Sequence, residues 1–318
     1  MQQPRLSHFQ KWALATFFAT LFLIFVGGFV RASGAGLGCP DWPRCWGSWW
    51  PPSSMERVDP ALYEVAEFNK TLMCVEYGNR LVGVAVGIFV LVTSILGFRF
   101  RKTDPPVFWG GIASLLLVII QGWLGGRVVK SGLHSGMITI HMALAVVLLS
   151  LLLWIVYRTS SYFKNGIGLA DSVRKPLRAA GLVLFLLTVG QILLGAQVRE
   201  AVDAIADAAP ASVTRDTWIE ATGRIFTSHR TAAWALVAAV VALIVFSKKA
   251  VSVPGVRPLV WASAAGVLAQ AATGAAMAYL ALPPAAQILH LGFSTVLSST
   301  SFLLVLILRR SVDTSAHG

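Results

Sequence analysis

The chain has 318 residues, of which 56% are hydrophobic and only 13% are charged, and its formal net charge is +12. This composition excludes a disordered or ordinary soluble protein and predicts an integral membrane protein. The positive charge is not the footprint of a nucleic-acid-binding protein, because the basic residues gather in short segments between apolar runs.

Eight apolar runs are each long enough to cross a bilayer as a helix, which takes about 20 residues. In chain order they lie near 12–32, 74–98, 107–128, 137–157, 179–198, 224–247, 258–281 and 285–308. Backbone polar groups inside lipid must be satisfied within the protein, and none of these runs alternates as a barrel strand does. The sequence therefore predicts an all-α integral membrane protein with eight transmembrane helices.

The charges between the runs predict the orientation in the membrane. With the N-terminus inside, the inner segments carry 15 of the 26 basic residues and three of the 14 acidic ones, which leaves 11 of each outside. Cytoplasmic loops are enriched in Lys and Arg. We expect a multi-pass protein of the inner (cytoplasmic) cell membrane with both termini in the cytoplasm and two long outer loops, 33–73 and 199–223.

The first outer loop contains two cysteines, Cys39 and Cys45, on either side of a Pro-Asp-Trp-Pro-Arg segment. Outside the membrane, two cysteines six residues apart can close a disulfide, and so small a ring tends to be labile and redox-active. Cys74, at the start of the next run, is left over. Four tryptophans of this loop are either an aromatic belt at the membrane surface or a lid over a hydrophobic ligand.

The runs form an internal repeat of four. The matching stretches are Gly27–Arg31 with Gly195–Arg199 and Gln121–Gly125 with Gln270–Gly274. Repeats of the same direction are related by an axis along the membrane normal. We predict two pseudo-symmetric four-helix bundles, formed by residues 1–160 and 161–318.

One polar residue in each of four runs falls at a matching point of this repeat. Asn79 and His141 lie 62 positions apart in the first half, and His229 and His290 lie 61 apart in the second. Imidazole is a common metal ligand, and facing helices of a bundle commonly build haem sites. We interpret His229 and His290 as the axial ligands of a haem; the alternative is a hydrogen bond that only packs helices.

The first half differs from the second. Asn79 stands where the repeat predicts an iron ligand, but its amide is a poor one. Glu76, on the same helix face, stands where the second half has Phe226. Glu76 is either the structural partner of an outer arginine or a proton acceptor beside an open iron, and we favour the proton acceptor. The first half is then a reaction site and the second an electron-transfer site.

Several arginines lie at the outer ends of the runs. They are Arg31, Arg80, Arg127, Arg199, Arg224 and Arg230, and of these Arg80 and Arg230 directly follow two of the paired positions. Guanidinium groups bind carboxylates in pairs of hydrogen bonds, and haem propionates would supply such carboxylates. Ordinary anchoring at the membrane surface is the alternative, and for Arg199 and Arg224 it is the better one.

Taken together, these residues resemble the haem A synthase family. The strongest match is Gly27–Cys45, and Glu76–Arg80, His141, His229-Arg230 and His290 are similar to further family motifs. The resemblance covers nearly the whole chain. It implies an oxidoreductase that converts a methyl group of haem O to the formyl group of haem A for haem–copper terminal oxidases, with a haem b in the C-terminal half.

The resemblance also implies roles for single residues. His229 and His290 would ligate the iron of haem b, and His141 the iron of the substrate haem. Glu76 would be the family's essential carboxylate, and Cys39 with Cys45 its outer disulfide; with Asn79, these are the candidate catalytic residues. Asn79 departs from the family, which usually has a histidine there. Three interpretations stay open: a five-coordinate site, another ligand, or a relative with changed activity.

The implied partners are haem O and haem A, haem O synthase, a terminal oxidase, membrane lipid and an electron acceptor that the sequence does not identify. A homo-oligomer is compatible with this set, and no nucleic acid is expected. One alternative function is a bis-histidine membrane cytochrome that only passes electrons. Another is a thiol–disulfide redox protein, which would want a Cys-x-x-Cys pair that the sequence lacks.

Overall fold

The computed structural model describes residues 6–208, 210, 214–250, 253 and 255–310. Within these residues the secondary structure is helical, apart from one isolated bridge between Cys45 and Ser48. Eight of the described helices are long and apolar enough to cross a membrane. The predicted all-α membrane architecture is therefore confirmed.

The eight long helices each overlap one predicted run. They are α1 (His8–Ala32), α2 (Lys70–Gly97), α3 (Pro105–Lys130), α4 (Ser135–Arg158), α6 (Asp171–Ala208), α8 (Arg224–Ser247), α9 (Val256–Tyr279) and α10 (Pro284–Ile307). Two short helices, α5 (Ser161–Asn165) and α7 (Trp218–Ala221), lie in the connections. Local signals place several starts: the side chains of Ser7 and Asn69 cap α1 and α2, and prolines open α3 and α10.

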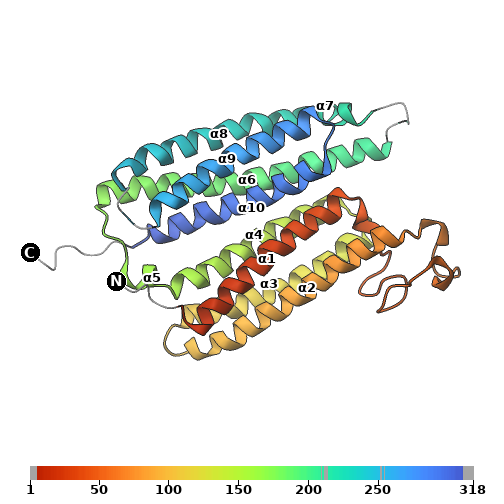
Figure 1. The fold of residues 1–318 in the computed structure, drawn as a ribbon, viewed down its shortest axis with the longest axis horizontal. Coiled ribbons are helices and arrows are strands. Elements are labelled where there is room, and N and C mark those ends of the chain that lie inside the picture. The colour runs from red at the N-terminus through yellow and green to blue at the C-terminus, as the bar shows by residue number, and fades with distance from the viewer. Residues whose placement is uncertain (1–5, 209, 211–213, 251–252, 254, 311–318) are drawn as a thin grey trace, which may run out of the picture.

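The long helices form two four-helix bundles that lie side by side (Figure 1). In the first bundle α1 packs on α2, α2 on α3, α3 on α4 and α4 on α1, and α6, α8, α9 and α10 follow the same order in the second. Between the bundles α1 packs on α10, α4 on α6, and α4 on α10. Exchanging the two halves leaves this set of neighbours unchanged, which fits two pseudo-symmetric bundles.

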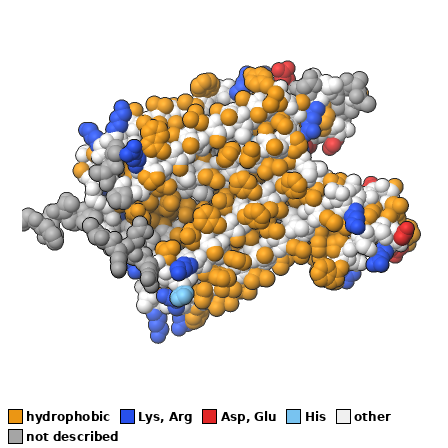
Figure 2. All heavy atoms as spheres, viewed as in Figure 1, with side chains coloured by type: hydrophobic (Ala, Val, Ile, Leu, Met, Phe, Trp, Pro, Cys, Tyr) orange, Lys and Arg blue, Asp and Glu red, His pale blue; other side chains and the backbone are white. Residues whose placement is uncertain are grey.

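The outer surface of the helices is apolar. Phe22, Trp109, Leu116, Trp234 and Leu268 are all exposed, and Figure 2 shows hydrophobic side chains covering the flank of both bundles. Contiguous apolar surface of this extent is not stable in water. The chain is therefore a multi-pass membrane protein.

The sequence predicts a loop over 199–223, and this prediction is wrong for residues 199–208. Helix α6 continues to Ala208 and has 38 residues, nearly twice the about 20 that a span needs. Four of its last ten residues are alanine, which has the highest helix propensity. Arg199 also pairs with Asp203 one turn further on. The helix therefore continues past the membrane surface.

The outer loop between α1 and α2 has a small core of its own. Its buried residues are Cys39, Cys45, Trp46, Val58 and Met73. The carboxylate of Asp41 accepts from the amides of Trp46 and Gly47 at 2.7 and 3.0 Å. Burial and the neighbouring Asp41 raise the pKa of Tyr63, which packs against this core. The loop is thus a folded lobe on the end of the first bundle.

Candidate functional site

His229 and His290 face each other across the second bundle. They come from α8 and α10, their ring centroids are 6.3 Å apart, and their planes are inclined by 62°. A metal–imidazole bond is about 2 Å long and the ring centre lies about 1.1 Å behind the nitrogen, so one metal between two rings puts the centres about 6 Å apart. The observed separation fits a single metal ion held by both rings. These two residues therefore fit the axial positions of a haem iron.

A hydroxyl on α9 fixes the tautomer of His290. Thr273 Oγ1 lies 2.9 Å from His290 Nδ1 and 2.7 Å from the carbonyl oxygen of Ala269. A hydroxyl has one proton, which here is donated to the carbonyl, so the oxygen accepts the Nδ1 proton of His290. Nε2 is then unprotonated and free to bind a metal, as is usual for metal-binding histidines.

The first bundle places His141 on α4 and Asn79 on α2, diagonally across from it. His141 Nδ1 and Asn79 Oδ1 are both buried, and neither has a hydrogen-bond partner among the described residues. Buried polar atoms without partners are costly and call for an explanation such as an absent ligand. A ligand between His141 and Asn79 would explain both unpaired atoms, and this site stays a prediction.

Glu76 and Arg80 connect α2 to the outer loop. Glu76 is 3% exposed; one oxygen accepts from the amide of Cys39 at 2.7 Å, and the other from Arg80 Nε at 3.1 Å. Arg80 also donates to the carbonyl oxygens of Cys39, Asp41 and Arg44, at 3.2, 2.8 and 2.8 Å. The structure thus shows Glu76 as the partner of an outer arginine, and the role of proton acceptor stays a prediction.

The outer cysteines pair as predicted. Cys39 and Cys45 form a disulfide, and Cys74 is free and exposed. Neither bridged cysteine has exposed surface, so an external thiol reaches the sulfur atoms only if the loop opens. A redox role for this disulfide stays a prediction.

The tryptophans of the outer loop divide into two groups. The ring of Trp42 lies against α3 at Gly126, where an added Cβ would be 2.6 Å from it. The neighbouring Gly125 faces the ring of His141, whose nearest atom would lie 3.8 Å from an added Cβ. Trp49 and Trp50 are exposed and suit a membrane surface.

Arg127 and Arg230 are the remaining arginines predicted to bind haem propionates, and this role stays a prediction. Arg127 and Arg230 are exposed, and the guanidinium of Arg230 lies 5.4 Å from the ring centre of Phe226. The structure shows an arginine site that the sequence reading missed: Arg31 and Arg199, counterparts in the repeat, both pair with Asp203. The one available signal was the spacing of four between Arg199 and Asp203.

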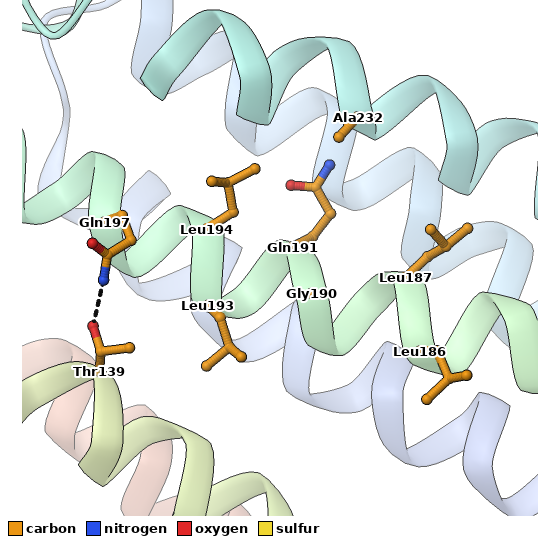
Figure 3. A pocket seen from close by; sticks show the side chains of 9 residues that line it. All are labelled: Thr139, Leu186, Leu187, Gly190, Gln191, Leu193, Leu194, Gln197 and Ala232. Atoms are coloured by element: carbon orange, nitrogen blue, oxygen red, sulfur yellow. Dashed lines mark hydrogen bonds between the residues drawn. The ribbon is translucent and has the colours of Figure 1, made fainter. Parts of the chain in front are cut away.

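A groove of about 510 Å³ lies on the surface of α6, between α4 and α8 (Figure 3). Four of its nine lining residues are leucines, and at one end Gln197 donates to Thr139 at 2.8 Å. Gln191, at its middle, donates to the backbone carbonyl of His229. The groove thus borders the C-terminal site, but it contains none of the predicted site residues.

Comparison with known proteins decides the family. A family model described as cytochrome oxidase assembly protein matches residues 10–302. The chain belongs to this family. Its relatives include proteins named haem A synthase, so the resemblance to that family is confirmed.

The similarity to individual relatives is partial. The chain is 30% identical to the haem A synthase of Shewanella oneidensis over 187 residues, which are 58% of this chain and 55% of that protein. For Geobacillus kaustophilus the identity is 32% over 160 residues, 48% and 45% of the two chains. For Bacillus cereus it is 29% over 134 residues, 42% and 38%. The matched part of the chain thus spans about half the length of these relatives, or less.

Proposed function

We propose that the protein is a haem A synthase, which oxidises a methyl group of haem O to the formyl group of haem A for haem–copper terminal oxidases. The family and the names of the relatives support this function. The observation that carries it is the presence of two unlike polar sites at equivalent places of the two bundles. One has a histidine pair whose ring centroids are 6.3 Å apart, and the other has one histidine and one asparagine, each with a buried polar atom that has no partner among the described residues.

The C-terminal half, residues 161–318, is the haem b half in this proposal. His229 and His290 would hold the iron, with Thr273 keeping His290 in the metal-binding tautomer. When bound, haem b supplies a one-electron acceptor close to the substrate half. Held by two imidazoles, haem b would supply electron transfer and not chemistry on a substrate.

The N-terminal half, residues 1–160, is the substrate half. His141 would bind the iron of haem O, while Asn79 leaves the opposite face open, because an amide is a poor iron ligand. Glu76 lies one turn from Asn79 on the same helix face and takes up a proton released as the methyl group is oxidised. Arg80 holds this carboxylate in place, and Trp42 helps to keep water from the site.

The orientation proposed for the chain puts both termini in the cytoplasm of a cell with the protein in its inner membrane. Both sites then lie near the outer surface, and haem O synthase and a terminal oxidase are the expected partners. The support is the excess of Lys and Arg in the inner segments. A reporter fused after Arg310 that is active only on the outer side would contradict this orientation.

The second candidate is a bis-histidine cytochrome that only passes electrons. The engagement of both Glu76 oxygens by Cys39 and Arg80 is compatible with it, since it gives this carboxylate a structural role, whereas the family and the relatives support the enzyme. Pyridine haemochrome analysis and mass spectrometry of haem from the purified protein, co-expressed with haem O synthase, distinguish the two. Haem A or its hydroxylated precursor supports the enzyme, and haem B alone supports the cytochrome.

A further inference from the structure

Each of the three site histidines is held through its backbone by a glutamine of a neighbouring helix. The pairs, with their Nε2 to carbonyl oxygen distances, are Gln121–His141 (3.0 Å), Gln191–His229 (3.0 Å) and Gln270–His290 (2.6 Å). A carbonyl within an α-helix already accepts the amide of the residue four positions on, so the glutamine uses its second lone pair. The histidine side chain itself stays free to bind a ligand.

A glycine follows each of these glutamines by four residues, on the same helix face. A Cβ added at Gly125, Gly195 or Gly274 would lie within 3.8, 3.2 and 3.5 Å, respectively, of the ring of the histidine that the preceding glutamine holds. Each imidazole therefore lies over the bare backbone of the neighbouring helix. We call each such Gln-x-x-x-Gly pair a cradle.

The fourth equivalent position, Asn79, has only half of a cradle. By the repeat, the residues of α1 that correspond to Gln191 and Gly195 are Leu23 and Gly27. Leucine cannot donate a hydrogen bond, and no atom lies within 4 Å of a Cβ added at Gly27. The glycine of the cradle is thus present on α1, but position 23 has no glutamine and position 79 has no histidine.

We propose that Gln121, Gln191 and Gln270 are positioning residues for haem-ligating histidines, and that position 79 has lost its ligand together with its cradle glutamine. The proposal rests on the haem binding proposed above. An imidazole that reaches an iron depends on the rotation and height of its helix, and a bond to the backbone fixes both. Helix pairs in lipid lack a hydrophobic driving force, so such bonds between helices are a natural means of fixing them.

The chain offers a matched control for these glutamines. Gln197, six residues after Gln191 on α6, donates to the side chain of Thr139 on α4 and not to a histidine carbonyl. Replacing it with leucine removes a glutamine from the same helix and leaves every cradle intact. Leucine is the right replacement in all cases, because position 23 of this chain carries it in the corresponding place.

The first experiment compares Gln191→Leu and Gln270→Leu with Gln197→Leu in the purified holoprotein. We expect the two cradle variants to lose the low-spin haem b signal to apomyoglobin about tenfold faster than the wild type, in line with outer-shell partners of metal ligands. Gln197→Leu is expected to retain haem as the wild type does. Equal haem retention in all three variants overturns the proposal. A wild-type protein without low-spin haem contradicts the proposed function instead.

The second experiment rebuilds the missing cradle and does not depend on weakened variants. Asn79→His and the double variant Asn79→His/Leu23→Gln are loaded with substrate haem, and the spin state is read by electron paramagnetic resonance. The haem signal of the C-terminal half serves as the internal measure of folding. We expect a mixture of high- and low-spin substrate haem in the single variant and mainly low-spin haem in the double. If the added glutamine leaves the spin state unchanged, the positioning role is wrong.

Discussion

In each bundle an arginine contacts the residue four positions before it on the same helix, but that residue differs between the bundles. On α8, Arg230 lies over the ring of Phe226, four residues earlier; on α2, its counterpart Arg80 pairs with Glu76 at the same spacing. A buried carboxylate in a membrane helix is costly unless it is paired. At this position the two halves differ. The N-terminal half has the charged Glu76, which also binds the outer lobe through Cys39, whereas the C-terminal half has the uncharged Phe226.

The largest effect is expected for the ligands of the C-terminal half. His229→Ala or His290→Ala should abolish low-spin haem b absorbance while the protein still inserts, since one remaining imidazole leaves a weakly held high-spin iron. Optical spectra of the purified variants measure this. His134→Ala, in an exposed position, is the control and should keep the spectrum. Unchanged spectra in both ligand variants would remove the cofactor assignment.

Replacing Glu76 tests what the N-terminal half adds. Glu76→Gln retains an oxygen that can accept from Cys39 but removes the charge, so turnover of haem O should fall by about 100-fold or more, the usual loss of a general base. The C-terminal haem spectrum should not change. Glu64→Gln, exposed in the same loop, is the control. Full turnover in Glu76→Gln would make Glu76 structural and remove its role as the proton acceptor.

A smaller effect is expected at His290, whose ring has a side-chain partner in Thr273. Thr273→Val removes the acceptor for His290 Nδ1, and haem b should be retained about tenfold more weakly, with a shifted reduction potential. Thr273→Ser keeps the hydroxyl and should restore both values. Potentiometric titration of the holoprotein measures the shift. Identical potentials for the valine and serine variants would contradict the tautomer assignment.

The outer lobe can be loosened without touching a site residue. A Cβ at Gly38 would lie 2.5 Å from the backbone of Leu72, so Gly38→Ala should destabilise the docked lobe by about 1–3 kcal/mol, as overpacking does. Trapping of free thiols after mild reduction, and limited proteolysis, report on the lobe. Gly87→Ala, where an added Cβ meets no atom within 4 Å, should behave as the wild type.

The smallest effect is expected where the halves meet. Asp203→Asn leaves Arg31 and Arg199 facing each other without a counter-charge, but these side chains are partly exposed. The loss of stability should be about 1 kcal/mol, which thermal unfolding in detergent at low and high salt can measure. Asp207→Asn, on the same exposed helix end, is the control. A loss that does not shrink with salt would argue against a charge effect.

The sequence predicts the spans well because a membrane helix is defined by a long apolar run, and seven of the eight runs match a helix to within a few residues at both ends. It missed the end of α6, because residues 199–208 are polar enough to read as a loop although their alanines favour helix. Apolar periodicity carries no information on a helix that leaves the membrane and continues in water.

The candidate site was predictable only in part. The repeat identified Gln121 and Gln270 as counterparts in the two halves. It also identified His229 and His290 as a pair, because they lie at nearly the same separation as Asn79 and His141 in the first half. The role of Gln191 could not be predicted, since its contact with His229 joins α6 and α8 across a long loop. The same holds for Asp203, whose partner Arg31 lies in the other half of the chain.

The carboxylate of Asp203 also influences which halves of the chain can pack together when two copies of the protein meet. It serves one arginine from each half, yet the residue at the corresponding point of the N-terminal half is Ala35. Two N-terminal halves from different chains, docked in the same way, would therefore bring Arg31 against Arg31 with nothing negative between them. A fold built from a repeat is open to such exchange between copies, and this unrepeated aspartate disfavours the union of two N-terminal halves.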